Sequence, residues 1–155
     1  MKIEQQKVIN ISLEKLWVSL HDPAILASTI PWIDSFQEDS LNEYRFSINV
    51  GMGAIMGKFS GKIIIEDIVK ESQYVMYANA KGPGGWIKGK TLFQLLSLTD
   101  SKSQLKIQTD LHIGGVLERV GKRLMKNVAR NQVDKFFKQL ERVQDGQKKE
   151  DNSSY

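Results

Sequence analysis

The sequence contains no cysteine, only two histidines and no long hydrophobic run. Without cysteine, the chain can form no disulfide, no thiolate metal site and no cysteine nucleophile. No stretch approaches the roughly 18 consecutive apolar residues of a transmembrane helix, and the first six residues lack the apolar core of a signal peptide. We therefore expect a soluble protein of the cytoplasm.

Charge is distributed unevenly along the chain. The 155 residues carry a net charge of +4, while residues 116–143 contain eight basic and three acidic side chains. This segment accounts for the whole excess, so the rest of the chain is close to neutral. A basic excess confined to one segment favours an anionic surface or an acidic partner over a nucleic-acid groove. We expect no nucleic-acid partner.

The segment from Val116 to Val143 has a sustained helical periodicity. Its apolar side chains recur at three- to five-residue steps and form one stripe: Leu117, Val120, Leu124, Val128, Val133, Phe136, Leu140 and Val143. The pattern predicts a long amphipathic helix with a basic outer face. Because such a helix must bury its stripe, we expect a sheet curved around it, with ligand contact near Leu117 and plain core from Phe136 onwards.

Local patterns predict the remaining elements. Alternation from Ile3 predicts an edge strand, Ser12 caps a helix over residues 13–20, and Asp22 with Pro23 begins a second short helix. Six further strands are predicted at residues 33–39, 43–50, 57–69, 73–81, 86–98 and 105–113, with a loop at residues 51–57.

These elements predict an α+β fold, a seven-stranded antiparallel sheet curved around the C-terminal helix with two short helices after the first strand. Gly84, after Pro83, supplies the positive φ of a type II turn. We expect a single domain at residues 1–144, followed by a disordered polar tail at residues 145–155.

Few residues are placed for catalysis. His21 lies between the two short helices. His112 shares a strand face with Asp110, an arrangement that resembles a general base and the carboxylate that orients it. Without a third ligand or a nearby nucleophile, this pair is interpreted as a surface pair. Glu66 and Asp67 point to opposite faces of a strand, unlike a glycosidase pair. We predict no catalytic residues, no metal site and no cofactor.

Two glycine motifs are candidates for anion binding. Gly51-Met52-Gly53 misses the dinucleotide-binding spacing and lies between two strands, where no helix begins, so we expect no nucleotide binding there. Gly114-Gly115 precedes the long helix. The two glycines either allow a sharp turn of the backbone into that helix or form an anion-binding site at its start.

Large apolar side chains gather on the predicted inner faces and loops. Methionine among them adapts to ligands of varied shape, and a curved sheet over one helix leaves a gap between the two. Glycines at positions 51, 53, 57, 61 and 89 are expected to keep this gap open. The predicted ligand-binding residues are Trp32, Phe46, Ile48, Met52, Ile55, Phe59, Ile63, Met76, Trp86, Phe93, Leu111, Leu117, Val120, Leu124 and Val128.

An ordered set of motifs spans residues 3–141. It comprises residues 20–27 (LHDPAILA), Ile30-Pro31, Gly51-Met52-Gly53, residues 57–62 (GKFSGK), residues 82–85 (GPGG), Gly114-Gly115, Gly121, Arg123-Leu124, Ala129 and Phe136-Phe137. In these motifs the chain resembles the carbon monoxide dehydrogenase G-subunit family, part of the START-like (SRPBCC, helix-grip) superfamily of lipophilic-ligand binders.

The resemblance implies a sheet that grips the C-terminal helix around a cavity. It also implies accessory work on molybdenum-dependent carbon monoxide dehydrogenases and related hydroxylases, including membrane attachment and the carrying of a quinone-like ligand. Two features depart from the family. Trp32-Ile33 follows Pro31 where the family often has Gly-Cys, and a polar tail stands where membrane-attached members carry a hydrophobic segment.

Three functional hypotheses follow. The leading one is a non-enzymatic protein that binds a hydrophobic, lipid- or quinone-like small molecule between sheet and helix, as accessory to a molybdenum hydroxylase or carbon monoxide dehydrogenase. The alternative is an assembly or membrane-docking factor that contacts an oxidoreductase partner or an anionic membrane through Arg119, Lys122, Arg123 and Lys126. The third is a hydrolase or cyclase that uses the aspartate–histidine pair.

Overall fold

The computed structural model describes residues 1–30, 32–52, 55–120 and 122–153. In chain order its elements are β1 (Lys2–Ile9), α1 (Leu13–Leu20), α2 (Pro23–Thr29), β2 (Ile33–Ser40), β3 (Glu43–Met52), β4 (Ile55–Val69), β5 (Gln73–Gly82), β6 (Gly85–Thr99), β7 (Lys102–Gly115), the 3-10 helix η1 (Val116–Val120) and α3 (Lys122–Ser153). Within the described residues, seven strands form a sheet in the order β1-β7-β6-β5-β4-β3-β2, with every neighbouring pair antiparallel. The predicted α+β fold is confirmed.

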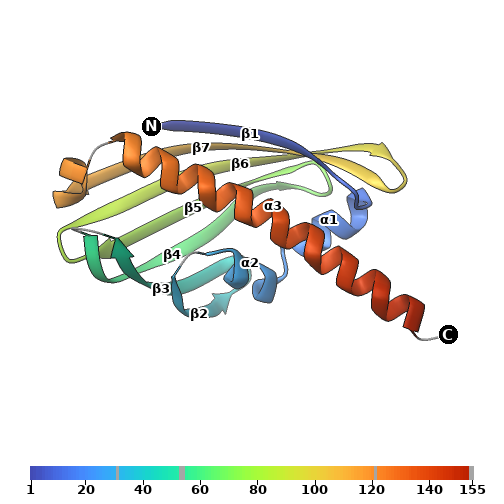
Figure 1. The fold of residues 1–155 in the computed structure, drawn as a ribbon, viewed down its shortest axis with the longest axis horizontal. Helices are drawn as coiled ribbons and strands as arrows, with labels where there is room; N and C mark the ends of the chain where they lie inside the picture. Colours follow the sequence, from blue (N-terminus) through green and yellow to red (C-terminus); the bar gives the residue numbers. More distant parts are fainter. Residues whose placement is uncertain (31, 53–54, 121, 154–155) are drawn as a thin grey trace.

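The long helix lies across one face of the curved sheet. Figure 1 shows α3 crossing this face diagonally, with α1 and α2 beside it and its C-terminal end projecting past the strands. Helix α2 contacts α3, and α1 contacts β6 and β7. The two short helices therefore cover the part of the inner face that a single helix leaves open. Strands β1 and β2 form the two edges of the sheet, as predicted for β1.

The predicted helix starts are confirmed by their caps. The Ser12 side chain accepts a hydrogen bond from the Lys15 backbone N–H at 3.3 Å, and the Asp22 carboxylate accepts one from the Ala24 N–H at 2.9 Å. Each cap satisfies an N–H group that has no partner within its helix. The two caps fix where α1 and α2 begin, and α2 then lies against α3.

Alternation along the strands sends one set of apolar side chains to the inner face. The register aligns Ile65, Met76, Thr91, Thr109 and Ile3 in one row across five strands. The most deeply buried side chains of the core are Tyr74, Phe59, Ile9, Ile11, Leu16, Leu20, Leu105 and Leu140. The turn between β5 and β6 also agrees with the sequence, because Gly84 has a φ of 87°.

Two predicted element boundaries are wrong, and the first concerns the loop at residues 51–57. The loop expected at residues 51–57 is a hairpin, in which Gly51 pairs with Met56 and Met52 with Ile55. Ladder hydrogen bonds need no side chain, so the glycines there do not prevent strand pairing. Residues 53 and 54, which also belong to the expected loop, lie outside the described residues.

The helix predicted from Val116 to Val143 is two helices, η1 and α3, and helical backbone continues to Ser153. Gln, Lys and Glu beyond residue 144 are good helix formers, and extending an existing helix needs no new nucleation. The domain boundary at residue 144 stays a prediction.

Candidate ligand cavity

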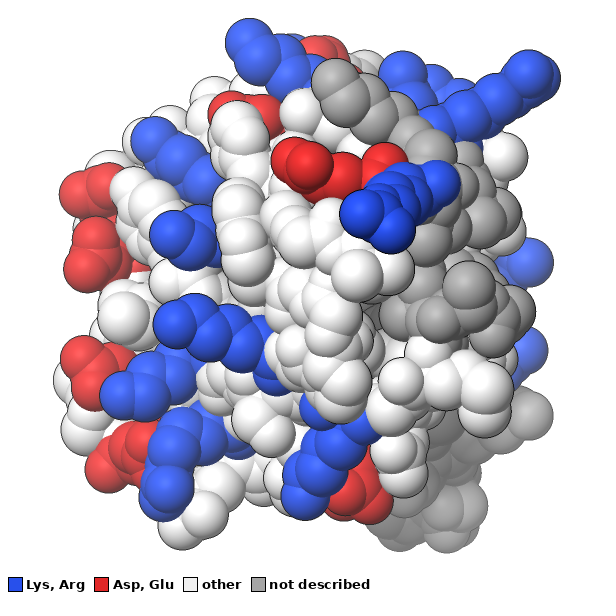
Figure 2. Space-filling model, turned by 90° about the vertical axis from the view of Figure 1, so that its left-hand side faces the viewer, with Lys and Arg blue, Asp and Glu red and all other residues white. Residues whose placement is uncertain are grey.

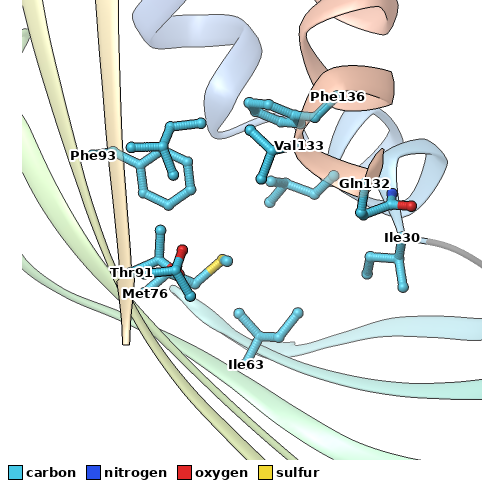
Figure 3. A pocket seen from close by; sticks show the side chains of 11 residues that line it. Ile30, Ile63, Met76, Thr91, Phe93, Gln132, Val133 and Phe136 are labelled. Carbon is cyan, nitrogen blue, oxygen red and sulfur yellow. The ribbon is translucent and has the colours of Figure 1, made fainter. Parts of the chain in front are cut away.

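A cavity of about 190 Å³ lies between the inner face of the sheet, α2 and α3. Figure 3 shows side chains from all three layers pointing into it. An apolar cavity of about 150 Å³ accepts a benzene ring, so this one has room for a small ring system. Its lining residues are Leu26, Ile30, Ile63, Met76, Thr91, Phe93, Ile107, Thr109, Gln132, Val133 and Phe136.

The floor of the cavity comes from four strands in the middle of the sheet. Ile63 is on β4, Met76 on β5, Thr91 and Phe93 on β6, and Thr109 on β7. Side chains two residues apart on a strand share a face, so these residues all point to the same side of the sheet. The floor is apolar except for the two threonines.

The threonine hydroxyls form a hydrogen bond with each other. Thr91 and Thr109 are directly opposite in the β6–β7 ladder, and their Oγ1 atoms are 3.0 Å apart. Thr91 is only 8% exposed. The cavity floor therefore carries one part-buried polar pair among apolar side chains.

An aromatic cluster closes one side of the cavity. The Phe93 ring is stacked on Tyr74, with centroids 4.6 Å apart, and meets Phe136 edge-on at 6.3 Å. Behind Phe93, the Tyr74 ring contacts His21 at 4.7 Å and Trp17 at 5.7 Å. This cluster connects α1, the sheet and α3. Its ring contacts hold the Phe93 side chain in place at the side of the cavity.

Two buried polar atoms in this cluster lack a hydrogen-bond partner within the described residues, Tyr74 Oη and His21 Nε2. Tyr74 is 1% exposed, and burial raises the pKa of its phenol strongly because the charged form would be desolvated. The His21 Nδ1–H group donates a hydrogen bond to the Trp17 carbonyl oxygen, with the two atoms 2.8 Å apart. His21 is thereby a part-buried side chain whose ring is oriented by the end of α1.

Three of the predicted ligand-binding residues line the cavity: Ile63, Met76 and Phe93. Phe46 and Ile48, on β3, are buried in the hydrophobic core. Leu111 and Val128 lie outside the cavity lining. For Met52, Ile55, Val120 and Leu124, the side chains lie outside the described ones. The ligand-binding role of all these residues stays a prediction.

Other predicted residues fill spaces left by glycine. A Cβ on Gly82 would meet the Phe59 ring, and one on Gly114 would meet the Trp86 ring. A Cβ on Gly61 would meet the β5 backbone. The expectation that glycines keep a gap open is therefore wrong at Gly61, because the neighbouring strand occupies that space.

The cavity contacts the middle of α3 and not its start. Leu117 is buried, and its side chain lies where a Cβ on Gly85 would stand. It fills the end of the sheet at which ligand contact was expected. Phe136, expected to be plain core, lines the cavity together with Gln132 and Val133.

Trp32 lies outside the cavity lining and is 42% exposed. Its φ of 53° is in the left-handed region, which costs a non-glycine residue about 1–2 kcal/mol. The motif resemblance placed a glycine at this position, and glycine adopts this conformation without strain. The Trp32 carbonyl accepts a hydrogen bond from the Asn49 N–H at 2.9 Å, which ties the residue to β3.

The aspartate–histidine pair lies on the surface, as interpreted from the sequence. His112 Nε2 is 3.4 Å from Asp110 Oδ2, and both side chains are exposed and outside the cavity lining. Within the described residues, no three His, Asp or Glu side chains come together as metal ligands would. None of the described helices combines the length and hydropathy of a membrane span.

The residues predicted for surface docking lie on η1 and the start of α3. Arg119 and Arg123 are exposed, Lys126 is partly exposed, and the Lys122 side chain is outside the described ones. Figure 2 shows the end of the molecule where η1 lies, with Lys and Arg interspersed among Asp and Glu. This end is mixed in charge and not uniformly basic.

Comparison with known proteins places the chain in a family. Residues 6–143 match the model of the family described as the carbon monoxide dehydrogenase G subunit (CoxG). The chain belongs to the CoxG family. A comparison with curated protein sequences gives no match.

Solved structures share the fold of this CoxG-family chain. A conserved protein from Geobacillus kaustophilus is 24% identical, with a TM-score of 0.86 over 92% of this chain and 94% of that one. A START superfamily protein from Mycobacterium smegmatis is 13% identical, with a TM-score of 0.71 over 90% and 94%. The Zhui aromatase/cyclase from Streptomcyes sp. R1128 is 10% identical, with a TM-score of 0.64 over 90% of each chain. These similarities establish the START-like, helix-grip fold.

Proposed function

We propose that this CoxG-family chain is a non-enzymatic binding protein that holds an apolar or amphipathic small molecule, lipid- or quinone-like, between the sheet and α3. In this proposal it serves a carbon monoxide dehydrogenase or a related molybdenum hydroxylase as an accessory protein, and it works in the cytoplasm. The family description supports the partner, and the cavity supports the ligand.

The observation that carries the proposal is the apolar lining of the cavity. Eight of its eleven lining side chains are hydrocarbon or thioether groups, and none is charged. A ligand that fills this space gains about 25 cal/mol for each Å² of apolar surface removed from water. Lipophilic molecules therefore fit the cavity better than charged metabolites do.

Ligand screening tests the proposal directly. Purified protein is examined by native mass spectrometry for a co-purified small molecule, and its melting temperature is measured with quinones, lipids and fatty acids. A ligand at one hundred times its Kd should raise the melting temperature by roughly 5–11 °C. A protein that is empty and that none of these compounds stabilises would contradict the proposal.

A matched pair of helix variants locates the site. Val133 lines the cavity, whereas Val128 lies on the same helix outside the lining. Val133→Trp should place an indole in the cavity and weaken ligand binding at least tenfold. Val128→Trp tests the contact predicted at Val128, and it should leave binding near wild type if the ligand occupies only this cavity. Because both variants make the same change in α3, equal losses of binding would place the ligand elsewhere.

The second candidate function is docking to an oxidoreductase partner or an anionic membrane. Arg119 and Arg123 are exposed and have no ion-pair partner within the described residues, which favours it. Arg119→Glu with Lys122→Glu and Arg123→Glu should abolish binding to partner enzyme or to anionic vesicles and leave ligand binding intact. Unchanged binding to both surfaces would remove this candidate.

A further inference from the structure

The Thr91–Thr109 pair is the polar feature of the cavity floor. The two residues face each other across β6 and β7, and Met76 and Ile3 flank them in the same row. The two Oγ1 atoms are 3.0 Å apart, so one hydroxyl donates to the other. The pair is thus a fixed hydrogen-bonding group in an apolar site.

One hydroxyl hydrogen of the pair is left over. A threonine hydroxyl donates one hydrogen bond, so two hydroxyls bring two hydrogens, and the contact between them uses only one. Neither hydroxyl has a further hydrogen-bond partner within the described residues. The pair is part-buried, and a ligand that covers it would remove this donor from water. An acceptor on the ligand would replace the hydrogen bond to water that the donor loses.

The rest of the lining determines what kind of acceptor fits. No lining side chain is charged, so a carboxylate or phosphate at the floor would be buried without a counter-ion. A neutral oxygen, such as a ketone or quinone carbonyl or an ether, needs only the one donor that the pair supplies.

We propose that the Thr91–Thr109 pair is the polar anchor of the cavity and selects ligands that present one neutral hydrogen-bond acceptor on an apolar ring or chain. This inference rests on the proposed function, because it assumes that the cavity holds a ligand. It excludes ligands that enter with a charged head group towards the sheet.

The test uses two compounds of nearly the same size, 1-tetralone and tetralin, which differ by one carbonyl oxygen. Wild-type protein should bind 1-tetralone roughly 3–10-fold more tightly than tetralin in calorimetric titrations, as one net hydrogen bond predicts. The double variant Thr91→Val with Thr109→Val should lose the preference for 1-tetralone and favour tetralin, because the ketone oxygen would leave water without finding a donor. Replacing both partners of a hydrogen bond by groups of the same shape keeps the packing, so this variant should fold.

Further variants control for folding and for charge. Thr99→Val, on β6 beyond the cavity lining, should keep the preference for 1-tetralone. Thr91→Ser with Thr109→Ser keeps both hydroxyls and should also keep this preference, and its loss in this variant would refute the anchor even if the valine variant does not fold. The carboxylate analogue 1,2,3,4-tetrahydro-1-naphthoate should bind wild type at least tenfold more weakly than 1-tetralone.

The outcomes separate the two ideas. If 1-tetralone and tetralin bind wild type equally, or if the valine variant keeps the preference, the anchor is refuted while the proposed function stands. Tighter binding of the carboxylate would also overturn the anchor. If neither compound binds wild type, the anchor fails, and the screen with quinones, lipids and fatty acids decides the proposed function separately.

Discussion

Replacing Tyr74 by Phe should stabilise this protein. The Tyr74 ring packs against Phe93, His21 and Trp17, and Phe would keep these contacts. The hydroxyl oxygen is buried and has no hydrogen-bond partner within the described residues. Folding therefore removes it from water without replacing the hydrogen bonds it made there.

The size of the effect follows from that unpaired hydroxyl. A buried polar group without a partner costs about 1–3 kcal/mol, so Tyr74→Phe should raise the free energy of unfolding by this amount. In a protein of this length, that gain corresponds to a rise in melting temperature of roughly 2–12 °C. The matched control is Tyr44→Phe, whose hydroxyl is not among the buried unpaired atoms and whose removal should change stability by less than about 0.5 kcal/mol.

Urea denaturation of wild type and both variants measures the difference. A Tyr74→Phe protein that is no more stable than wild type would refute the reasoning. It would mean that the hydroxyl has a partner in solution, such as a water molecule shared with His21 Nε2.

The same variant has a predicted pH dependence. Burial raises the pKa of Tyr74 in the folded protein, so in the unfolded chain the phenol ionises first, near pH 10. The protonated phenol then favours folding fully below pH 10, and this contribution is lost as the pH rises above that value. Tyr74→Phe has no such loss, so its advantage over wild type should widen between pH 10 and pH 11.

Three further variants test local features. Ser12→Ala removes the cap on Lys15 and should lower the free energy of unfolding by about 0.5–2 kcal/mol in urea denaturation; no loss would mean that the cap is not formed. Glu71→Gly should raise the free energy of unfolding by up to about 1 kcal/mol, because Glu71 has a φ of 60°, which glycine adopts without strain. A lower free energy of unfolding would show that the Glu71 side chain contributes more stability than the backbone strain costs. The pKa of Glu4 is lowered chiefly by a hydrogen bond from the Gln108 side chain. Gln108→Leu should therefore raise the Glu4 pKa measured by NMR titration. An unchanged Glu4 pKa would exclude that hydrogen bond in solution.

The strands and helix starts were predictable because their signals are local. Alternation with a period of two depends only on neighbouring residues, and a cap needs only a few consecutive ones. Ser12 and Asp22 therefore marked both short helices, and Gly84 marked the turn before β6. The family resemblance rested on the same kind of local motif.

The threonine anchor was only half predictable. Alternation puts Thr91 on the same strand face as Phe93, and Thr109 on the same face as Ile107. The pairing of the two threonines depends on a register shift between Ser97 and Thr99. A regular continuation of the Thr99–Lys102 pair would set Thr91 opposite Asp110. The bulge moves the register by one residue and brings the two hydroxyls together, and no local pattern in the sequence announces it.

The sequence by itself determined the element order, the inner face of the strands that alternate clearly, and the amphipathic character of the last helix. These features depend on residues close together along the chain. Only the tertiary structure decided where the cavity lies. Leu117 fills the end of the sheet beside Gly85, while α2 approaches the middle of α3 and leaves the space bordered by Gln132, Val133 and Phe136. A cavity is the volume that distant elements fail to fill, so its place depends on how all of them pack together.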